Sequence, residues 1–200
     1  MQHKPTQAAF PLVVGACLFL LPALAFAHAG HSSSGAVGGF ISGFTHPIWG
    51  WDHLLAMLAV GIWGAQMGGS NVWSLPIAFP MVMAGGGALG AMKIPLPGVE
   101  ILIALSMVGL GVAVMLSWKP NDWIALVAVS VFAVFHGHAH GAELPTSADP
   151  TSYGMGFVIS TGLIHLVGIV LGLGAMKLNP RIVQGIGLGI GAAGCYALFG

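Results

Sequence analysis

The sequence predicts an all-α, polytopic membrane protein, and its composition is the first indication of that class. Five Lys and Arg residues and five Asp and Glu residues are the only charges among 200 residues, and 56% of the chain is hydrophobic. A soluble domain is about one quarter charged, so this chain could not cover a soluble surface. The same scarcity excludes a nucleic-acid-binding protein, which needs a basic face. The expected surroundings are a lipid bilayer.

The first 27 residues have the pattern of a cleaved signal peptide. Lys4 precedes an apolar run from Phe10 to Phe26, and Ala25-Phe26-Ala27 is a small-x-small cleavage site. An uncleaved first transmembrane helix is the alternative. Cleavage leaves a mature domain of residues 28–200.

After Ser34 the chain divides into six apolar segments separated by short polar or proline-containing breaks. A bilayer is spanned by about 20 mainly apolar residues, so each segment is expected to be a transmembrane helix. Pro47 is expected to break the first segment into a short helix and a span that starts at Ile48. The expected helices cover residues 36–67, 72–92, 98–117, 122–140, 153–175 and 181–199.

Glycines at four-residue spacing predict close packing between these helices, because small residues let helix backbones approach. The pairs with this spacing are Gly35/Gly39, Gly39/Gly43, Gly64/Gly68, Gly86/Gly90, Gly168/Gly172 and Gly187/Gly191.

Both mature termini are expected on the periplasmic or extracellular side of a bacterial inner membrane. A cleaved signal places the N-terminus there, and six spans return the C-terminus to the same side. Lys119, Lys177 and Arg181 then lie in cytoplasmic loops and only Lys93 lies outside, as the positive-inside rule requires. At the mature N-terminus, His28 and His31 would either bind a divalent metal weakly or belong to a polar leader.

Nine histidines in so apolar a chain indicate a functional site, because ionisable groups are expensive inside a bilayer. The topology places most of them, together with acidic residues, near the outer ends of the first, third and fourth spans. His165 lies near the midplane, where a hydrogen-bonded interior histidine is the alternative to a ligand. The residues at the outer ends are His46, Asp52, His53, Glu100, His136, His138, His140 and Glu143.

Spacing narrows this set. His136 and His140 are four residues apart and share one helix face, Glu143 continues that stripe, and His138 points away from it. His138 is therefore a weaker candidate. Glu100, which opens the third span, is a weaker candidate as well, and each of the two is either a ligand or an ordinary polar residue. Imidazole and carboxylate groups without thiolates suit Ni, Co, Zn or Fe(II).

Two segments resemble the signature motifs of the HupE/UreJ family of nickel permeases, which accompany hydrogenase or urease gene clusters. The segment from His46 to His53 matches His-x5-Asp-His, and the segment from Phe135 to Glu143 matches Phe-His-Gly-x-Ala-His-Gly-x-Glu. His138 falls at a variable position, and His165 resembles a further family feature. The resemblance implies Ni²⁺ uptake across the inner membrane, with His46, Asp52, His53, His136, His140 and Glu143 as the functional residues.

The expected function is therefore a Ni²⁺ permease that supplies a nickel enzyme such as hydrogenase or urease, with Co²⁺ or Zn²⁺ as other candidate cargo. The protein is not expected to be an enzyme or to carry a prosthetic group. The main alternative is an intramembrane zinc hydrolase with Glu143 as general base, although no H-E-x-x-H motif occurs. A haem-binding cytochrome and a metal sensor or storage protein are further alternatives. Homo-oligomerisation and metallochaperone partners are left open.

Overall fold

The computed structural model describes residues 35–146 and 148–200. The expected signal peptide, His28 and His31 lie outside the described residues. Within them the chain forms seven helices, and the only β-type pairing is one isolated bridge. The helices are α2 (Ala36–Trp49), α3 (Trp51–Met67), α4 (Asn71–Ala91), α5 (Val99–Met115), α6 (Asp122–Ala142), α7 (Pro150–Leu178) and α8 (Pro180–Phe199).

The all-helical prediction is confirmed, but the expected break at Pro47 is wrong. Pro47 lies inside α2, and the chain breaks three residues later at Gly50, whose backbone is extended at φ −76° and ψ 96°. Proline removes only its own N–H, the one that would bond the carbonyl of Gly43. The Gly50 N–H still reaches the carbonyl of His46 at 3.4 Å, so the last turn of α2 is retained.

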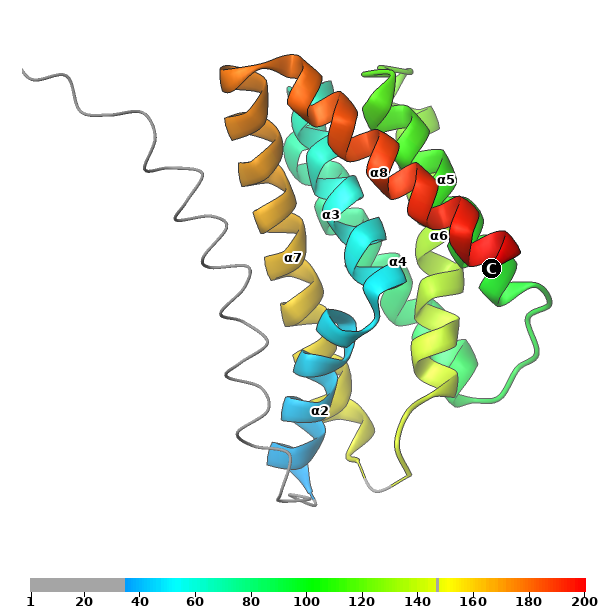
Figure 1. The fold of residues 1–200 in the computed structure, drawn as a ribbon. Coiled ribbons are helices and arrows are strands. Elements are labelled where there is room, and N and C mark those ends of the chain that lie inside the picture. Colours follow the sequence, from blue (N-terminus) through cyan, green and yellow to red (C-terminus); the bar gives the residue numbers. More distant parts are fainter. Residues whose placement is uncertain (1–34, 147) are drawn as a thin grey trace, which may run out of the picture. The chain divides into compact units, whose positions relative to one another are not determined.

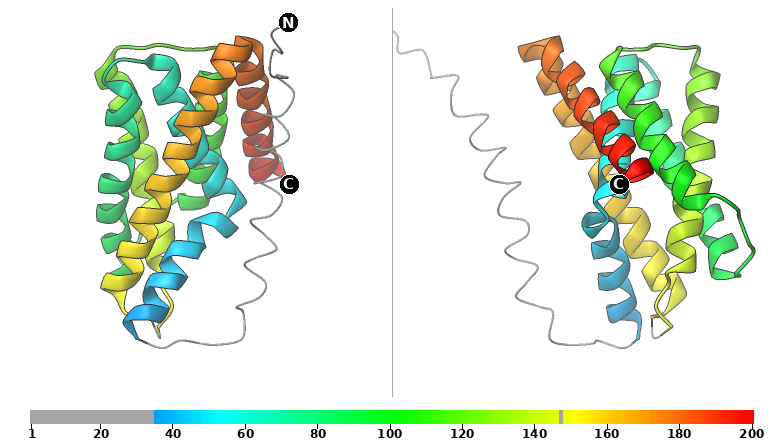
Figure 2. Two further views of the ribbon diagram at one scale, coloured as in Figure 1. Left: turned by 90° about the vertical axis from the view of Figure 1, so that its left-hand side faces the viewer. Right: turned by 45° about the vertical axis from the view of Figure 1, so that its right-hand side comes forward.

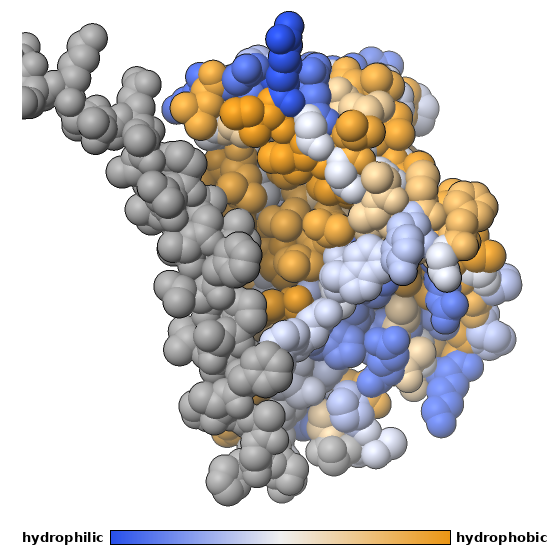
Figure 3. All heavy atoms as spheres, in the orientation of Figure 1, coloured by the Kyte–Doolittle hydropathy of each residue, from blue (hydrophilic) through white to orange (hydrophobic). Residues whose placement is uncertain are grey.

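Helix length and hydropathy fit a membrane protein. Among the described residues, four helices, α4, α6, α7 and α8, are long and apolar enough to cross a membrane, and α5 is a shorter apolar helix of 17 residues. Hydrophilic side chains gather at the end where α7 meets α8, and a mostly apolar surface follows directly beside them (Figure 3). This distribution is typical of a helix bundle whose middle contacts hydrocarbon.

Helix α3 lies at the centre of the bundle, between α7 and the pair formed by α5 and α8 (Figures 1 and 2). Every residue from Ala59 to Gln66 is buried. A helix that is apolar on all sides must be covered on all sides, and α2, α4, α5, α7 and α8 all contact it. The first turn of α3 is therefore held in place by several neighbours.

Glycines bring several helix pairs into close contact, as their spacing predicts. A Cβ atom added at Gly86 or Gly90 of α4 would overlap backbone atoms of α6, and one added at Gly61 or Gly168 would overlap backbone at the α3–α7 contact. The α5–α8 pair packs in the same way. The prediction is wrong for Gly35 and Gly68, where within the described chain an added Cβ meets nothing within 4 Å; both have positive φ and flank helix ends.

The end of the bundle opposite the histidines is tied by hydrogen bonds between side chains and backbone. The indole Nε1 of Trp63 donates to the carbonyl of Trp118 at 2.8 Å, and the amide of Gln66 donates to the carbonyl of Val114 at 3.0 Å. Both bonds join α3 to the C-terminal end of α5 or to the turn that follows it. They close this end of the helix bundle around α3.

Candidate metal site

Three helix ends bring the motif residues together at one end of the bundle. His46 lies in the last turn of α2, Asp52 and His53 lie in the first turn of α3, and His140 lies in the last turn of α6. His46 lies four residues before the break at Gly50 and Asp52 and His53 lie just after it, so both parts of the first motif stay at this end of the bundle. The two motifs are therefore joined across the helix bundle, as the topology predicts.

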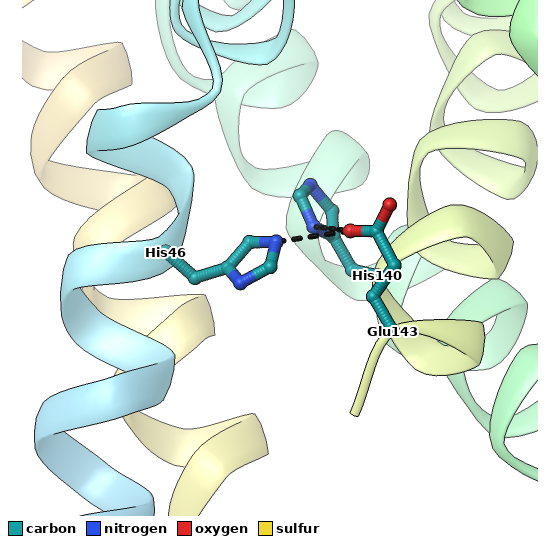
Figure 4. A group of neighbouring side chains, drawn as sticks. All are labelled: His46, His140 and Glu143. Carbon is teal, nitrogen blue, oxygen red and sulfur yellow. Dashed lines mark hydrogen bonds and ion pairs between the residues drawn. The ribbon is translucent and has the colours of Figure 1, made fainter. Parts of the chain in front are cut away.

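The outermost part of this group contains two imidazoles and one carboxylate. His46 Nε2 donates to Glu143 Oε2 at 3.1 Å, and His140 Nδ1 lies 4.0 Å from the same oxygen. The side chains of His46, His140 and Glu143 point toward one another from α2 and α6 (Figure 4). One ligand atom from each lies within 4.8 Å of the other two, which is close enough for all three to contact one cation after small rotations.

Two more imidazoles continue the group inward. The ring centroids of His53 and His140 are 4.1 Å apart, and those of His53 and His136 are 4.8 Å apart. His46 and His140 are 4.7 Å apart by the same measure. We call these four residues, His46, His53, His136 and His140, the histidine cluster.

Hydrogen bonds on Nδ1 orient two rings of the histidine cluster. His136 Nδ1 donates to the carbonyl of Phe132 at 2.9 Å, and His53 Nδ1 donates to Asp52 Oδ1 at 2.8 Å. Carbonyl and carboxylate oxygens only accept, so the proton is on Nδ1 and the lone pair is on Nε2. Metal-binding histidines are commonly held by such a second hydrogen bond. Asp52 thus lies where it can position His53 without being a ligand itself.

Within the described chain, the remaining ring nitrogens of the buried histidines make no hydrogen bond. Among the described residues, Nε2 of His53, Nε2 of His136 and both ring nitrogens of His140 have no hydrogen-bond partner. Buried polar groups are normally satisfied, and each exception needs an explanation. A cation bound between the rings would supply one.

Exposure falls steadily along the group from Glu143 inward. The Glu143 side chain is 60% exposed and that of His46 is 29% exposed, whereas His140 is 3% and His136 is 0% exposed. A hydrated cation can therefore reach the carboxylate first and lose water as imidazoles replace it. A cavity of ≈ 560 Å³ between α4, α6 and α7 also reaches His140, and its lining is mostly apolar.

The weaker candidates from the sequence lie apart from the histidine cluster. His138 Nε2 donates to the carbonyl of Ile94 at 2.7 Å, which ties α6 to the α4–α5 connection. Glu100 is exposed in the first turn of α5 and is not part of the group that the described residues offer to a metal. His165 is buried on α7, and the ring of Phe79 lies next to both His165 and His136.

The sequence reasoning missed the aromatic residues that line the histidine cluster. The Phe157 ring centroid lies 4.2 Å from that of His140, and Tyr153 lies 6.0 Å from His46. Both are on α7 and both are buried. The signal that could have found them is their four-residue spacing from each other and from Thr161 and His165, which places all four on one face of α7.

Membrane-length helices, with buried imidazoles and an exposed carboxylate at one end of the bundle, define an integral membrane protein with a candidate metal site. Comparison with known proteins gives the family. The chain belongs to the family described as HupE / UreJ protein, which matches residues 16–197. It is 41% identical over 183 residues to Protein HupE of Rhizobium leguminosarum bv. viciae, covering 90% of this chain and 93% of that protein. No solved structure matches it.

Proposed function

We propose that this protein is an inner-membrane permease for Ni²⁺ that supplies a nickel enzyme such as hydrogenase or urease. The single observation that carries the proposal is the histidine cluster with Glu143, which places unpaired imidazole nitrogens at one end of the bundle. Membership of the HupE / UreJ family supports the same assignment. Co²⁺ is the second cargo that this ligand set suits.

The donor atoms favour a borderline divalent ion. Imidazole nitrogens and a carboxylate oxygen suit Ni, Co and Zn, and affinity for such sites rises from Mn²⁺ through Ni²⁺ to Cu²⁺. The one cysteine of the described chain, Cys195, is exposed near the end of α8 and does not belong to the group of possible metal ligands. Without a thiolate, the set has no preference for Cu(I).

Transport requires binding that is followed by release, and the arrangement of the ligands offers a sequence of positions. Glu143, with His46 and His140, would take the hydrated ion at the surface. His53 and His136 would take it next, because their Nε2 atoms are buried beside His140. Several adjacent sites that share ligands allow an ion to leave each one more easily than a single closed cage would.

We propose that six helices cross the membrane, namely α3 to α8, with α2 as a short helix outside the first span. The proposal rests on the succession of apolar helices joined by short breaks, which makes neighbouring helices along the chain cross in opposite directions. It also rests on the cleaved signal expected in residues 1–27. It places both mature termini on the periplasmic or extracellular side, with Lys119, Lys177 and Arg181 on the cytoplasmic side. The histidine cluster then faces the side from which nickel arrives.

Uptake of Ni²⁺ by cells at limiting metal tests the function, and two neighbouring histidines on α6 provide a matched pair. His140→Ala removes two ring nitrogens that have no hydrogen-bond partner from the centre of the histidine cluster. Uptake is expected to fall by more than about 100-fold, because the loss of a residue that only hydrogen-bonds to a metal ligand already costs about 10–100-fold. His138→Ala removes a hydrogen bond to Ile94 only and should keep uptake near the wild-type level. Equal uptake by both correctly inserted variants would contradict the proposal.

Metal selectivity is measured in the same cells by competition. Excess Co²⁺ should reduce accumulation of Ni²⁺, and the wild-type protein should accumulate Ni²⁺ in preference to Zn²⁺ when both are limiting. Accumulation of Zn²⁺ alone would assign a different cargo.

A further inference from the structure

A second set of unpaired polar groups lies deeper in the bundle, halfway along α7. His165 is 1% exposed and Thr161 is 0% exposed. Neither the two ring nitrogens of His165 nor the hydroxyl of Thr161 has a hydrogen-bond partner anywhere in residues 35–146 and 148–200. Leaving a buried polar group without a hydrogen bond is unfavourable, so two such side chains one turn apart require an explanation beyond packing.

These groups continue a stripe that begins at the histidine cluster. Tyr153, Phe157, Thr161 and His165 follow one another at four-residue spacing and share one face of α7. Phe157 packs on His140 at the outer end of this stripe. The stripe therefore leads from the histidine cluster directly toward Thr161 and His165.

A backbone carbonyl joins this set because of two prolines in α4. In a regular helix the carbonyl of Pro76 would accept the N–H of the residue four positions later. That residue is Pro80, which has no N–H and whose ring pushes the carbonyl outward. The Pro76 carbonyl approaches the His165 ring, although the geometry falls short of a hydrogen bond. An oxygen freed from its helix is thus available beside the imidazole.

One aromatic ring separates this set from the histidine cluster. Phe79 is fully buried on α4, and its ring centroid lies 5.5 Å from that of His136 and 5.3 Å from that of His165. Both contacts are edge-type contacts, with interplanar angles of 67° and 79°. An ion leaving His136 therefore has His165 as its next imidazole, one ring further into the bundle.

We propose that His165, Thr161 and the carbonyl of Pro76 form a second, deeper binding site for the divalent cation, separate from the histidine cluster. This inference rests on the proposed function and extends it from capture at the surface to passage through the bundle. One imidazole, one hydroxyl and one carbonyl are neutral ligands, and this set lacks the carboxylate found at the outer site. It therefore holds the ion more weakly, which favours onward release.

The test compares equilibrium Ni²⁺ binding with Ni²⁺ uptake into proteoliposomes, using the purified full chain and Ni²⁺ alone. Thr161→Val removes the hydroxyl and keeps the side-chain shape, and Thr161→Ser keeps the hydroxyl. His165→Ala removes the imidazole. The wild type should bind one tight and one weaker equivalent of Ni²⁺, and both Thr161→Val and His165→Ala should lose the weaker one.

The tight equivalent should remain within about twofold of wild type in both variants, which also shows that they fold. The maximal uptake rate should fall at least about tenfold in His165→Ala and by less in Thr161→Val, while Thr161→Ser stays near wild type. Wild-type uptake and two retained equivalents in Thr161→Val and His165→Ala would overturn the deeper site. Loss of the tight equivalent in both Thr161→Val and His165→Ala would show that the deeper site is not separate from the histidine cluster, and would overturn the proposal of a second site.

The wild type and His140→Ala distinguish the two proposals. If the wild type neither binds nor transports Ni²⁺, the proposed function itself fails. If the wild type transports, His140→Ala loses tight binding and His165→Ala transports at the wild-type rate, the function stands and only the deeper site fails.

Discussion

Gly137 lies between two histidines of the second motif, and replacing it with alanine should displace α6 from α4. A Cβ atom at this position would overlap the carbonyl oxygen of Met83 and would lie 2.8 Å from the carbonyl carbon of the same residue and 2.9 Å from the nitrogen of Gly87. All of these are backbone atoms of α4, so no side-chain rotation can relieve the overlap.

The magnitude of this displacement follows from ordinary contact distances. Carbon atoms are best separated by about 3.5–4.0 Å, so a Cβ at 2.8 Å requires the helices to separate by at least about 0.7 Å. A gap of about 0.5–1 Å already removes a quarter to a half of the dispersion attraction across a contact. Overpacking of this kind costs about 1–3 kcal/mol. His136 would move with α6, which changes its position relative to His53 on α3.

Gly85→Ala is the matched control, because in the part of the chain that the structure describes its added Cβ meets nothing within 4 Å. Both substitutions add one methyl group in a helix and gain the same helix propensity of about 1 kcal/mol, which cancels in the comparison. The free energy of unfolding of the detergent-solubilised protein should therefore be about 1–3 kcal/mol lower for Gly137→Ala than for Gly85→Ala. Equal unfolding free energies would refute the reasoning, and Ni²⁺ binding should weaken only in Gly137→Ala.

Three further predictions concern other parts of the molecule. Asp52→Asn should weaken Ni²⁺ affinity by about 10–100-fold, because the carboxylate that orients His53 is lost; calorimetry measures it, and unchanged affinity would remove Asp52 from this role. Hydrogen bonds from Ser152 hold the pKa of the Asp149 carboxyl below its usual range, so its stabilisation of α7 is present above about pH 3.9 and is lost as the pH falls through the lower folded value. Unfolding of wild type should thus respond more to acid than that of Asp149→Asn, and identical pH profiles would argue against this effect. A reporter fused after Gly200 and active only outside the cytoplasm should be active, whereas a silent one would contradict the proposed topology.

The helices could be predicted from the sequence because their signals are local. Apolar length and short breaks located all of them to within a few residues. The start of α7 at Pro150, three residues earlier than expected, was also encoded locally: Asp149 accepts from the Ser152 N–H and proline occupies the first turn, which is a common way to begin a helix. The break at Gly50 was missed because a proline within a helix does not always end it.

The candidate site was predictable in part. The sequence alone determined which imidazoles and carboxylates share one end of the bundle, since the alternating direction of successive helices and the position along each helix decide the end at which a residue lies. It could not determine that His53 meets both His136 and His140, or that Asp52 holds His53 by its Nδ1. Those contacts depend on how closely neighbouring helices approach and on the side-chain rotamers they permit.

Only the tertiary structure decided what surrounds His165. Its neighbour Thr161 is one turn away on the same helix, but Phe79 and the carbonyl of Pro76 come from α4, far along the chain. The sequence alone determined that Pro80 frees that carbonyl, because a missing N–H is a local property. Which residue the freed oxygen faces depends on the packing of α4 against α7. The sequence of one segment determines its hydropathy, whereas the close approach of two backbones depends on both helices of a pair.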